Sequence, residues 1–200
     1  MKLPKDWSEI TIAQFIEITN ILNDNKDNNI QAMIFIMACL SGKSNQEIEA
    51  IEIDRFTGYT KDLAFLNQDK FKDQIINSFE IDGIKYIPKY KFNKLTAGQF
   101  IDIHSLAADI NNIHKLLAVV CMPKGAEHED VAEIFYNKLT MDKAYPIFLF
   151  FCVVLEIYLK ATKDYLERLI KKEKKELSKM ARKAKTPSTI VGRGLSYLMN

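Results

Sequence analysis

The sequence predicts a mainly α-helical fold: a duplicated helical module with one inserted β-hairpin and a long C-terminal helix that ends in an extended tail. Three observations predict it, namely a helix-start octet that occurs twice, a single Asp-Gly hairpin signal and a long C-terminal stretch of helical periodicity. We divide the chain into module copy 1 (residues 1–78), the hairpin (79–88), module copy 2 (89–170) and a basic helical arm with an apolar-tipped tail (171–200).

The repeat is the most informative feature of the sequence. The octet at 11–18 reads TIAQFIEI and the octet at 96–103 reads TAGQFIDI, which gives five identities in eight. The similarity extends upstream, where Trp7 corresponds to Phe92, and downstream, where Cys39 corresponds to Cys121. The offset between the copies drifts along the chain, as expected when loop lengths differ between two homologous copies. Because a solenoid usually needs three or more repeats, we predict a single duplication and no solenoid.

Each octet has the residues of a well-formed helix start. Thr11 and Gln14 have the spacing of a capping box, and Ile10 and Phe15 have the spacing of a hydrophobic staple. The second octet repeats these roles with Leu95, Thr96, Gln99 and Phe100. A recognition signature is the alternative interpretation, but helix initiation accounts for every matched residue.

Further helix signals follow in each copy. In copy 1 we expect helices over Thr11 to Asn23 and Ile30 to Leu40, the latter capped by Gly42, and then helices that begin at Ser44 and at Thr60. In copy 2 we expect helices that begin near Thr96, Asn112, Glu127 and Thr140.

The segment between the copies predicts a β-hairpin. Asp82 and Gly83 suit a two-residue turn that requires positive φ at both positions. In that register Phe79 lies opposite Tyr86, Glu80 opposite Lys85 and Ile81 opposite Ile84. A lone hairpin is marginally stable in water, so we expect it to pack on helices or to pair with a strand of another subunit.

The C-terminal region predicts one long helix, from Ala144 to about Lys185. We expect its apolar first half to be buried and its polar second half, from Lys171, to extend into solvent or into a neighbour. Residues 160–200 carry twelve Lys/Arg and four Asp/Glu, although the whole chain has a net charge of only +2.

The arm and the tail are the candidate partner-binding residues. The basic candidates are Lys171, Lys172, Lys174, Lys175, Lys179, Arg182, Lys183 and Lys185, and the apolar candidates at the tail are Leu195, Tyr197, Leu198 and Met199. The basic residues have three interpretations: a solvated helix face, contact with an acidic protein surface, or contact with nucleic acid. The scarcity of arginine and of interleaved aromatic residues disfavours nucleic acid.

Composition excludes several classes of protein. Met1–Asp6 is charged and precedes no continuous apolar stretch, which argues against a secretory signal peptide. The most apolar run, Tyr145–Leu155, is shorter than the roughly 18 residues that a bilayer span requires, so we expect no membrane association. Three cysteines without close pairing indicate reduced thiols in a cytosolic setting.

No motif predicts an enzyme. The segment 41–44 (SGKS) resembles the end of a phosphate-binding loop, but Met37 occupies the position of the required glycine. The acidic residues around His128 fit the start of a helix better than a metal site. Cys39 and Cys121 lie inside apolar helices without a charged partner that would activate a thiol. We therefore expect no catalytic residue, no cofactor and no metal.

The N-terminal pattern resembles a known group of proteins. A proline at Pro4, an aromatic residue at Trp7 and a Thr-x-x-Gln-Phe helix start at Thr11 are similar to small neck, tail-ring and tail-assembly proteins of tailed bacteriophages, in particular the crAss-like phages of gut Bacteroidetes. The resemblance covers the first fifteen residues and their repetition near Thr96, and no binding residue of that family maps onto this chain.

The resemblance implies a non-enzymatic structural or assembly component of a tailed-phage virion, such as a neck, tail-ring or tail-barrel protein that is assembled in the host cytoplasm. The implied partners are other phage structural proteins and copies of the chain itself. The alternatives are a tail-assembly chaperone absent from the mature particle, a DNA-associated protein that uses the basic arm, and an enzyme of unrecognised type.

Overall fold

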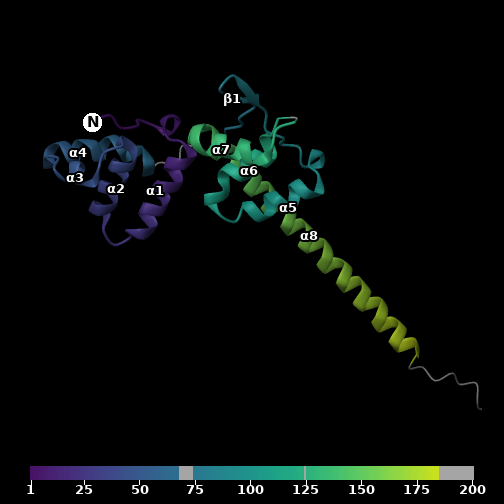
Figure 1. The fold of residues 1–200 in the computed structure, drawn as a ribbon. Coiled ribbons are helices and arrows are strands. Elements are labelled where there is room, and N and C mark those ends of the chain that lie inside the picture. The colour runs from purple at the N-terminus through teal and green to yellow at the C-terminus, as the bar shows by residue number, and fades with distance from the viewer. Residues whose placement is uncertain (68–73, 124, 185–200) are drawn as a thin grey trace, which may run out of the picture. The chain divides into compact units, whose positions relative to one another are not determined.

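A computed structural model describes residues 1–67, 74–123 and 125–184, of which 181–184 are described as backbone. The fold is mainly α with one inserted two-stranded hairpin and a long C-terminal helix, which confirms the predicted class (Figure 1). The chain forms two units, Met1–Val154 and Leu155–Asn200, and the second is described as far as residue 184. Copy 1 and residues 89–154 of copy 2 lie in the first unit, and residues 155–170 of copy 2 lie in the second.

Helices make up the chain on both sides of the hairpin. Copy 1 contains η1 (Trp7–Glu9), α1 (Ile12–Asp24), α2 (Asn29–Ser41), α3 (Asn45–Glu49), α4 (Ile53–Asp62) and η2 (Leu63–Asn67). The hairpin consists of β1 (Phe79–Ile81) and β2 (Ile84–Tyr86). Copy 2 contains η3 (Phe92–Lys94), α5 (Ala97–Leu106), η4 (Ile110–Asn112), α6 (Ile113–Cys121), α7 (His128–Lys138) and the start of α8 (Met141–Ala184).

The predicted helix starts are present as capping boxes. The hydroxyl of Thr11 accepts a hydrogen bond from the amide of Gln14, and the Gln14 side chain accepts one from the amide of Thr11. Thr96 and Gln99 repeat this exchange. Gly42 ends α2 in the left-handed region with a φ of 69°, as predicted for a glycine cap.

The two copies show the same local arrangement. In each, a 3-10 turn precedes the capped helix, and the helix packs against the next one, α1 on α2 and α5 on α6. Trp7 contacts Phe15 edge-on at a ring-centroid distance of 5.9 Å, and Phe92 contacts Phe100 in the same way at 6.2 Å. Trp7 and Phe92 correspond upstream of the octets, and Phe15 and Phe100 correspond within them. Common descent of the copies stays a prediction, which this correspondence supports.

The hairpin has the predicted register and turn. Phe79 lies opposite Tyr86, and Asp82 and Gly83 have φ values of 52° and 76°. The rings of Phe79 and Tyr86 are stacked, and both contact Phe135 of α7 edge-on at centroid distances of 5.5 and 4.9 Å. Of the two packing arrangements that we expected for the hairpin, the structure therefore shows packing on a helix of the same chain.

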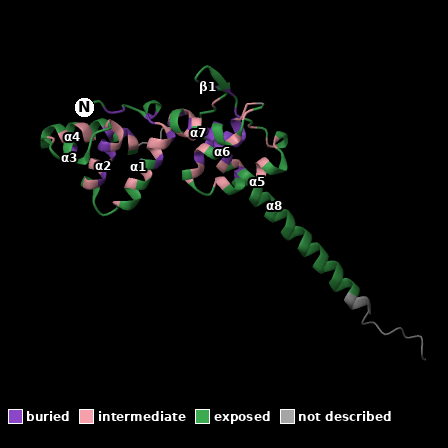
Figure 2. Ribbon diagram, viewed as in Figure 1, coloured by how far each residue is buried: buried purple, intermediate pink, exposed green. Residues whose placement is uncertain are grey.

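The hydrophobic core of unit 1 lies mainly in copy 2 and the start of α8. In α6 every residue except His114 and Lys115 is buried (Figure 2). Most buried positions of α8 are spaced three or four residues apart, as expected for one face of a helix, and Ile147 and Phe148 are adjacent. They are Met141, Ala144, Ile147, Phe148, Phe151 and Leu155.

Two predictions about helices are wrong. Thr60 does not begin a helix, because it lies inside α4, where its hydroxyl donates to the carbonyl of Thr57. The buried part of α8 ends at Leu155 and does not continue to the middle of the helix, since every residue from Glu156 to Met180 is exposed. The sequence prediction assumed that apolar content implied burial, and apolar residues beyond Leu155 do not meet the core.

Candidate partner-binding surface

The exposed part of α8, residues 156–180, holds most of the predicted basic candidates. Lys171, Lys172, Lys174, Lys175 and Lys179 are all exposed on this helix. Arg182 and Lys183 lie on its last turn, where only the backbone is described. Lys185 and the apolar candidates Leu195, Tyr197, Leu198 and Met199 lie outside the described residues.

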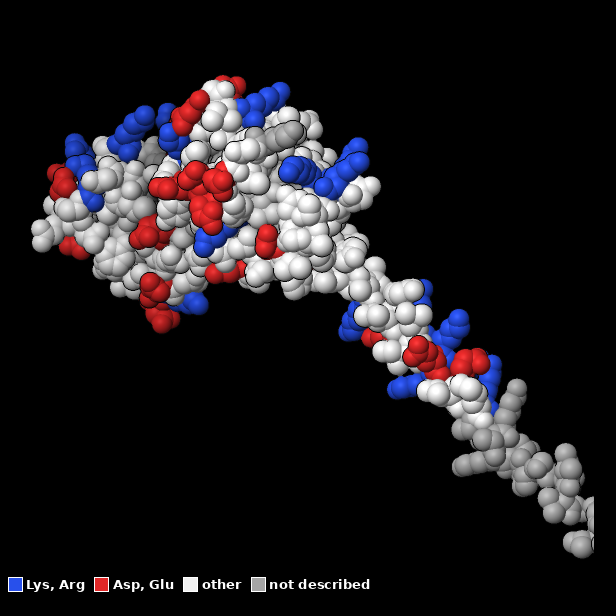
Figure 3. Space-filling view, turned by 45° about the vertical axis from the view of Figure 1, so that its right-hand side comes forward, with Lys and Arg blue, Asp and Glu red and all other residues white. Residues whose placement is uncertain are grey.

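The basic side chains are brought together on the polar side of α8. At about 100° per residue, Lys171, Lys175 and Lys179 follow one another at four-residue spacing, so they share one side of the helix. Lys179 pairs with Glu176 at 3.0 Å. Figure 3 shows positive and negative side chains along the helix with uncharged surface between them. An exposed ion pair at this spacing adds little stability, so the lysines remain available to a partner.

Sequence reasoning missed the apolar part of this surface. We define the α8 stripe as the six exposed residues Leu159, Leu166, Leu169, Ile170, Leu177 and Met180. The first four belong to the stretch that we predicted to be buried. A signal was present in the sequence, because Leu155, Leu166 and Leu177 recur at intervals of eleven residues, close to three full helical turns.

The same helix contains an apolar window long enough to cross a membrane. Within Met141–Met180, an 18-residue window has a mean hydropathy of 1.8, by length and composition sufficient for a span. This window is longer than the continuous apolar run Tyr145–Leu155 because a window may include charged residues. One third of the window is buried in the protein, where Ile147 and Phe151 are fully enclosed by the core. The other two thirds of the window are not buried in the protein.

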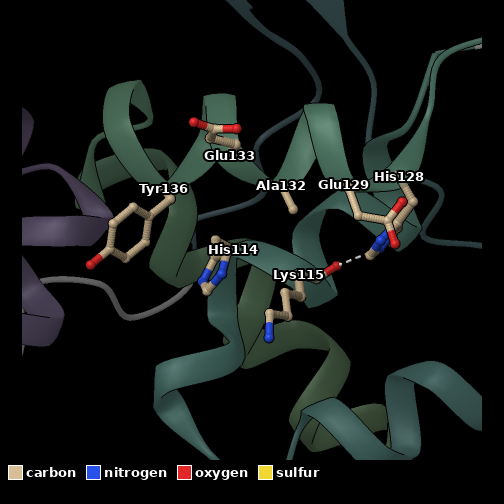
Figure 4. Close-up of a pocket in the computed structure, with 7 residues that line it drawn as sticks. All are labelled: His114, Lys115, His128, Glu129, Ala132, Glu133 and Tyr136. Atoms are coloured by element: carbon tan, nitrogen blue, oxygen red, sulfur yellow. Dashed lines mark hydrogen bonds between the residues drawn. The ribbon is translucent and has the colours of Figure 1, made fainter.

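A cavity of about 650 Å³ lies between α6 and α7. Figure 4 shows its lining, which consists of His114, Lys115, His128, Glu129, Ala132, Glu133 and Tyr136. A ring nitrogen of His128 lies 3.1 Å from the carbonyl oxygen of Lys115, so this imidazole is held by the backbone.

The second histidine of the cavity is held by packing. His114 meets Tyr136 edge-on at a centroid distance of 5.0 Å. Burial, with the nearby charge of Lys115, lowers the pKa of His114 and keeps its ring neutral near pH 7. Within the described ranges, no three His, Cys, Asp or Glu side chains are arranged to hold a metal ion.

The three thiols are in environments that disfavour the thiolate. Cys121 is buried, and burial raises its pKa well above the ordinary range. Burial also raises the pKa of Cys39, with a smaller contribution from the charge of Glu17, and it raises the pKa of Cys152. A thiol with a raised pKa is a poor nucleophile at neutral pH.

The segment that resembles a phosphate-binding loop has another role in the fold. Gly42 caps α2, and Ser44 caps α3 through a capping box with Glu47. The Lys43 ammonium pairs with the Glu47 carboxylate at 2.8 Å. The segment is therefore a helix–helix junction in which the groups that would contact a phosphate are already bonded.

Comparisons of the chain with known protein families, with curated protein sequences and with solved structures found no match.

Proposed function

We propose that this chain is a non-enzymatic structural or assembly component of a tailed-phage virion, a neck, tail-ring or tail-barrel protein that acts through protein–protein contacts. The observation that carries the proposal is the exposed part of α8, which combines the apolar α8 stripe with a lysine-rich polar side. Its partners are other phage structural proteins and copies of itself, and it is assembled in the host cytoplasm.

An exposed amphipathic helix of this length favours a binding role. Helices gain most of their stability from the packing of an apolar face, and an isolated helix is marginal in water. Contiguous exposed apolar surface on a folded protein marks an interaction site. No residue of 156–180 is buried, so the apolar face that would stabilise this segment has to be covered by a partner from outside the segment.

Unit 1 contains the first turns of α8. Its core includes the first turns of α8, where Ile147 and Phe151 are fully buried, so the exposed segment continues from an anchored helix. Tyr90 packs on Phe150 and Phe151 at centroid distances of 4.7 and 6.1 Å and fixes the same turns.

The phage setting is supported by the N-terminal resemblance. The residues that carry the resemblance have structural roles in the fold: Trp7 is buried against Phe15, and Thr11 caps α1. These roles are structural, so the resemblance supports a shared module and leaves the partner to be identified by experiment.

Quantitative mass spectrometry of purified particles of the encoding phage tests the proposal. We expect the chain in fixed stoichiometry to the tail and neck proteins after density-gradient purification. Recovery from infected cells with no trace in purified particles would identify a tail-assembly chaperone and overturn the virion role. The matched control is a host cytosolic protein of similar abundance, which measures carry-over.

The exposed lysines of α8 favour DNA association as a second candidate function. Binding that depends on phosphate contacts weakens steeply with salt. A DNA-associated chain would bind duplex DNA at low salt, lose most of that affinity by about 200 mM salt and lose all of it on truncation at Tyr165. Affinity that survives the truncation would exclude the arm as the DNA-binding element.

A further inference from the structure

The apolar residues of α8 beyond the core repeat every eleven residues. Leu155, Leu166 and Leu177 form one row, and a second row follows at the next turn. That second row consists of Tyr158, Leu169 and Met180, and Leu159 and Ile170 lie beside it. Eleven residues make three turns at 3.67 residues per turn, close to the natural pitch of the α-helix. The apolar side therefore stays aligned along the helix, which suits a long contact with another helix.

The stripe is exposed along its whole described length. Its six members have exposed fractions between 39% at Leu169 and 62% at Leu177. From Leu159 to Met180 the stripe runs for about 32 Å at 1.5 Å per residue. Leu155, the first residue of unit 2, is buried and precedes the exposed stripe.

Polar residues occupy the opposite side of the helix. Lys160, Lys171 and Arg182 form a row eleven residues apart, about 140 to 180° from the Leu155 row. Ile157 is the exposed large apolar residue that lies on this polar side, with an exposed fraction of 62%. This basic row of the segment therefore lies away from the stripe.

We infer that the α8 stripe is a self-association surface, which a second copy of this chain covers with its own α8 stripe. The inference rests on the proposed function and names the partner for that surface. Six half-exposed side chains present on the order of 500 Å² per helix, so a pair buries about 1,000 Å², the lower bound of a specific protein interface. The apolar row repeats every three turns, so the same row of a second copy can pack along it.

Glu173 argues for a protein partner and against a lipid surface. It lies eighteen residues after Leu155, five full turns, and therefore at the centre of the stripe between Ile170 and Leu177. Insertion of this face into a membrane would carry a carboxylate into the acyl region at high cost. In a helix–helix seam a polar residue can fix register and oligomer number at a cost in stability, and the two Glu173 carboxylates of a pair add to that cost.

The charges of the chain are compatible with this arrangement. Residues 155–200 carry twelve Lys/Arg and five Asp/Glu, so two associated arms repel each other. Most of these cations lie on the polar side, away from the seam, where solvent and salt screen them. Self-association through the stripe should therefore strengthen with added salt, the opposite of DNA binding.

Light scattering coupled to size-exclusion chromatography of the full chain tests the inference. We expect a concentration-dependent oligomer, and the double substitution Leu166→Glu and Leu169→Glu should weaken the dissociation constant by at least about 100-fold. The control is Ile157→Glu, which places a single such charge on an exposed apolar residue of the polar side and should leave the dissociation constant unchanged. Glu173→Leu removes the carboxylate from the seam and should tighten association.

Three results would overturn the inference. One is a monomer at every concentration and salt. Another is an oligomer that the double substitution leaves intact or that Ile157→Glu disrupts equally. The third is a monomer that sediments with vesicles of phosphatidylcholine and phosphatidylglycerol, which would assign the stripe to a lipid surface. None of these results decides the proposed function, which depends on the particles. A monomer that is found in purified particles would still be a virion component, and an oligomer that is absent from purified particles would not be one.

Discussion

Thr11 and Thr140 pair as an isolated antiparallel β-bridge that joins the start of α1 to the start of α8. The amide of Ile12 donates to the carbonyl of Leu139 at 3.0 Å, and the amide of Met141 donates to the carbonyl of Ile10 at 2.8 Å. These backbone groups precede helices and have no partner within a helix. The bridge satisfies them and connects the two predicted copies through main-chain bonds.

The cap of α5 should contribute measurably to stability. Thr96→Ala removes the hydroxyl that accepts from the Gln99 amide at 3.2 Å and should lower the free energy of unfolding by about 1 kcal/mol. Urea denaturation followed by circular dichroism measures the change. Thr57→Ala is the control, because Thr57 is an exposed mid-helix threonine whose hydroxyl only donates back to the carbonyl of Ile53, and its loss should change stability by less than about 0.5 kcal/mol.

The hairpin should depend on one aromatic residue of α7. Phe135 is fully buried and contacts both Phe79 and Tyr86, so Phe135→Ala leaves a cavity beneath the hairpin. We expect a loss of about 3–5 kcal/mol, measured by denaturant unfolding. Ile53→Ala removes a largely exposed side chain and should cost little. Equal losses for the two variants would show that the hairpin does not dock on Phe135.

The junction between α2 and α3 should titrate at low pH. Hydrogen bonds from Lys43, then those from the backbone and side chain of Ser44, lower the pKa of Glu47 to about 2. A carboxyl whose pKa is lower in the folded state stabilises the fold above the unfolded pKa of about 4.5, and this stabilisation is lost as the pH falls toward 2.

Carbon-13 NMR of the Glu47 side-chain carboxyl measures this pKa directly. Glu47→Gln keeps the acceptor oxygen and should flatten the dependence of stability on pH between about 4.5 and 2 at this site. A titration of Glu47 at the ordinary glutamate value would contradict the capping geometry.

The cysteines should react with a thiol reagent in the order of their burial. Cys121 is the most buried, and its raised pKa leaves almost no thiolate at pH 8, so it should react only when the core opens. The half-buried Cys39 and Cys152 should react first. Time-resolved intact-mass measurement in native buffer counts the modified thiols, and urea supplies the control in which all three react alike. Fast modification of Cys121 in native buffer would contradict its placement.

Local signals in the sequence predicted local structure well. The capping boxes at Thr11 and Thr96, the glycine cap at Gly42 and the register of the hairpin each depend on residues within a few positions of one another. Such patterns have one low-energy local solution, which tertiary contacts need not change.

Features that depend on long-range packing were harder to predict. Leu166 and Ile147 are large apolar residues of the same helix, yet Ile147 is buried and Leu166 is exposed, because only the first turns of α8 meet the core. The bridge between Thr11 and Thr140 has no sequence signal at all, since any two backbones can form it. The sequence therefore predicted the basic residues of the candidate surface but not its exposed apolar residues.

Hydrogen exchange of the α8 amides tests most directly whether a second copy covers the stripe. An isolated helix over 156–180 would be marginal, so its amides gain lasting protection only from a partner. We predict that peptides covering these residues in the full chain are protected at high protein concentration and lose protection on dilution, while peptides from α6 remain protected throughout. Equally fast exchange of the 156–180 peptides at every concentration would contradict self-association through α8.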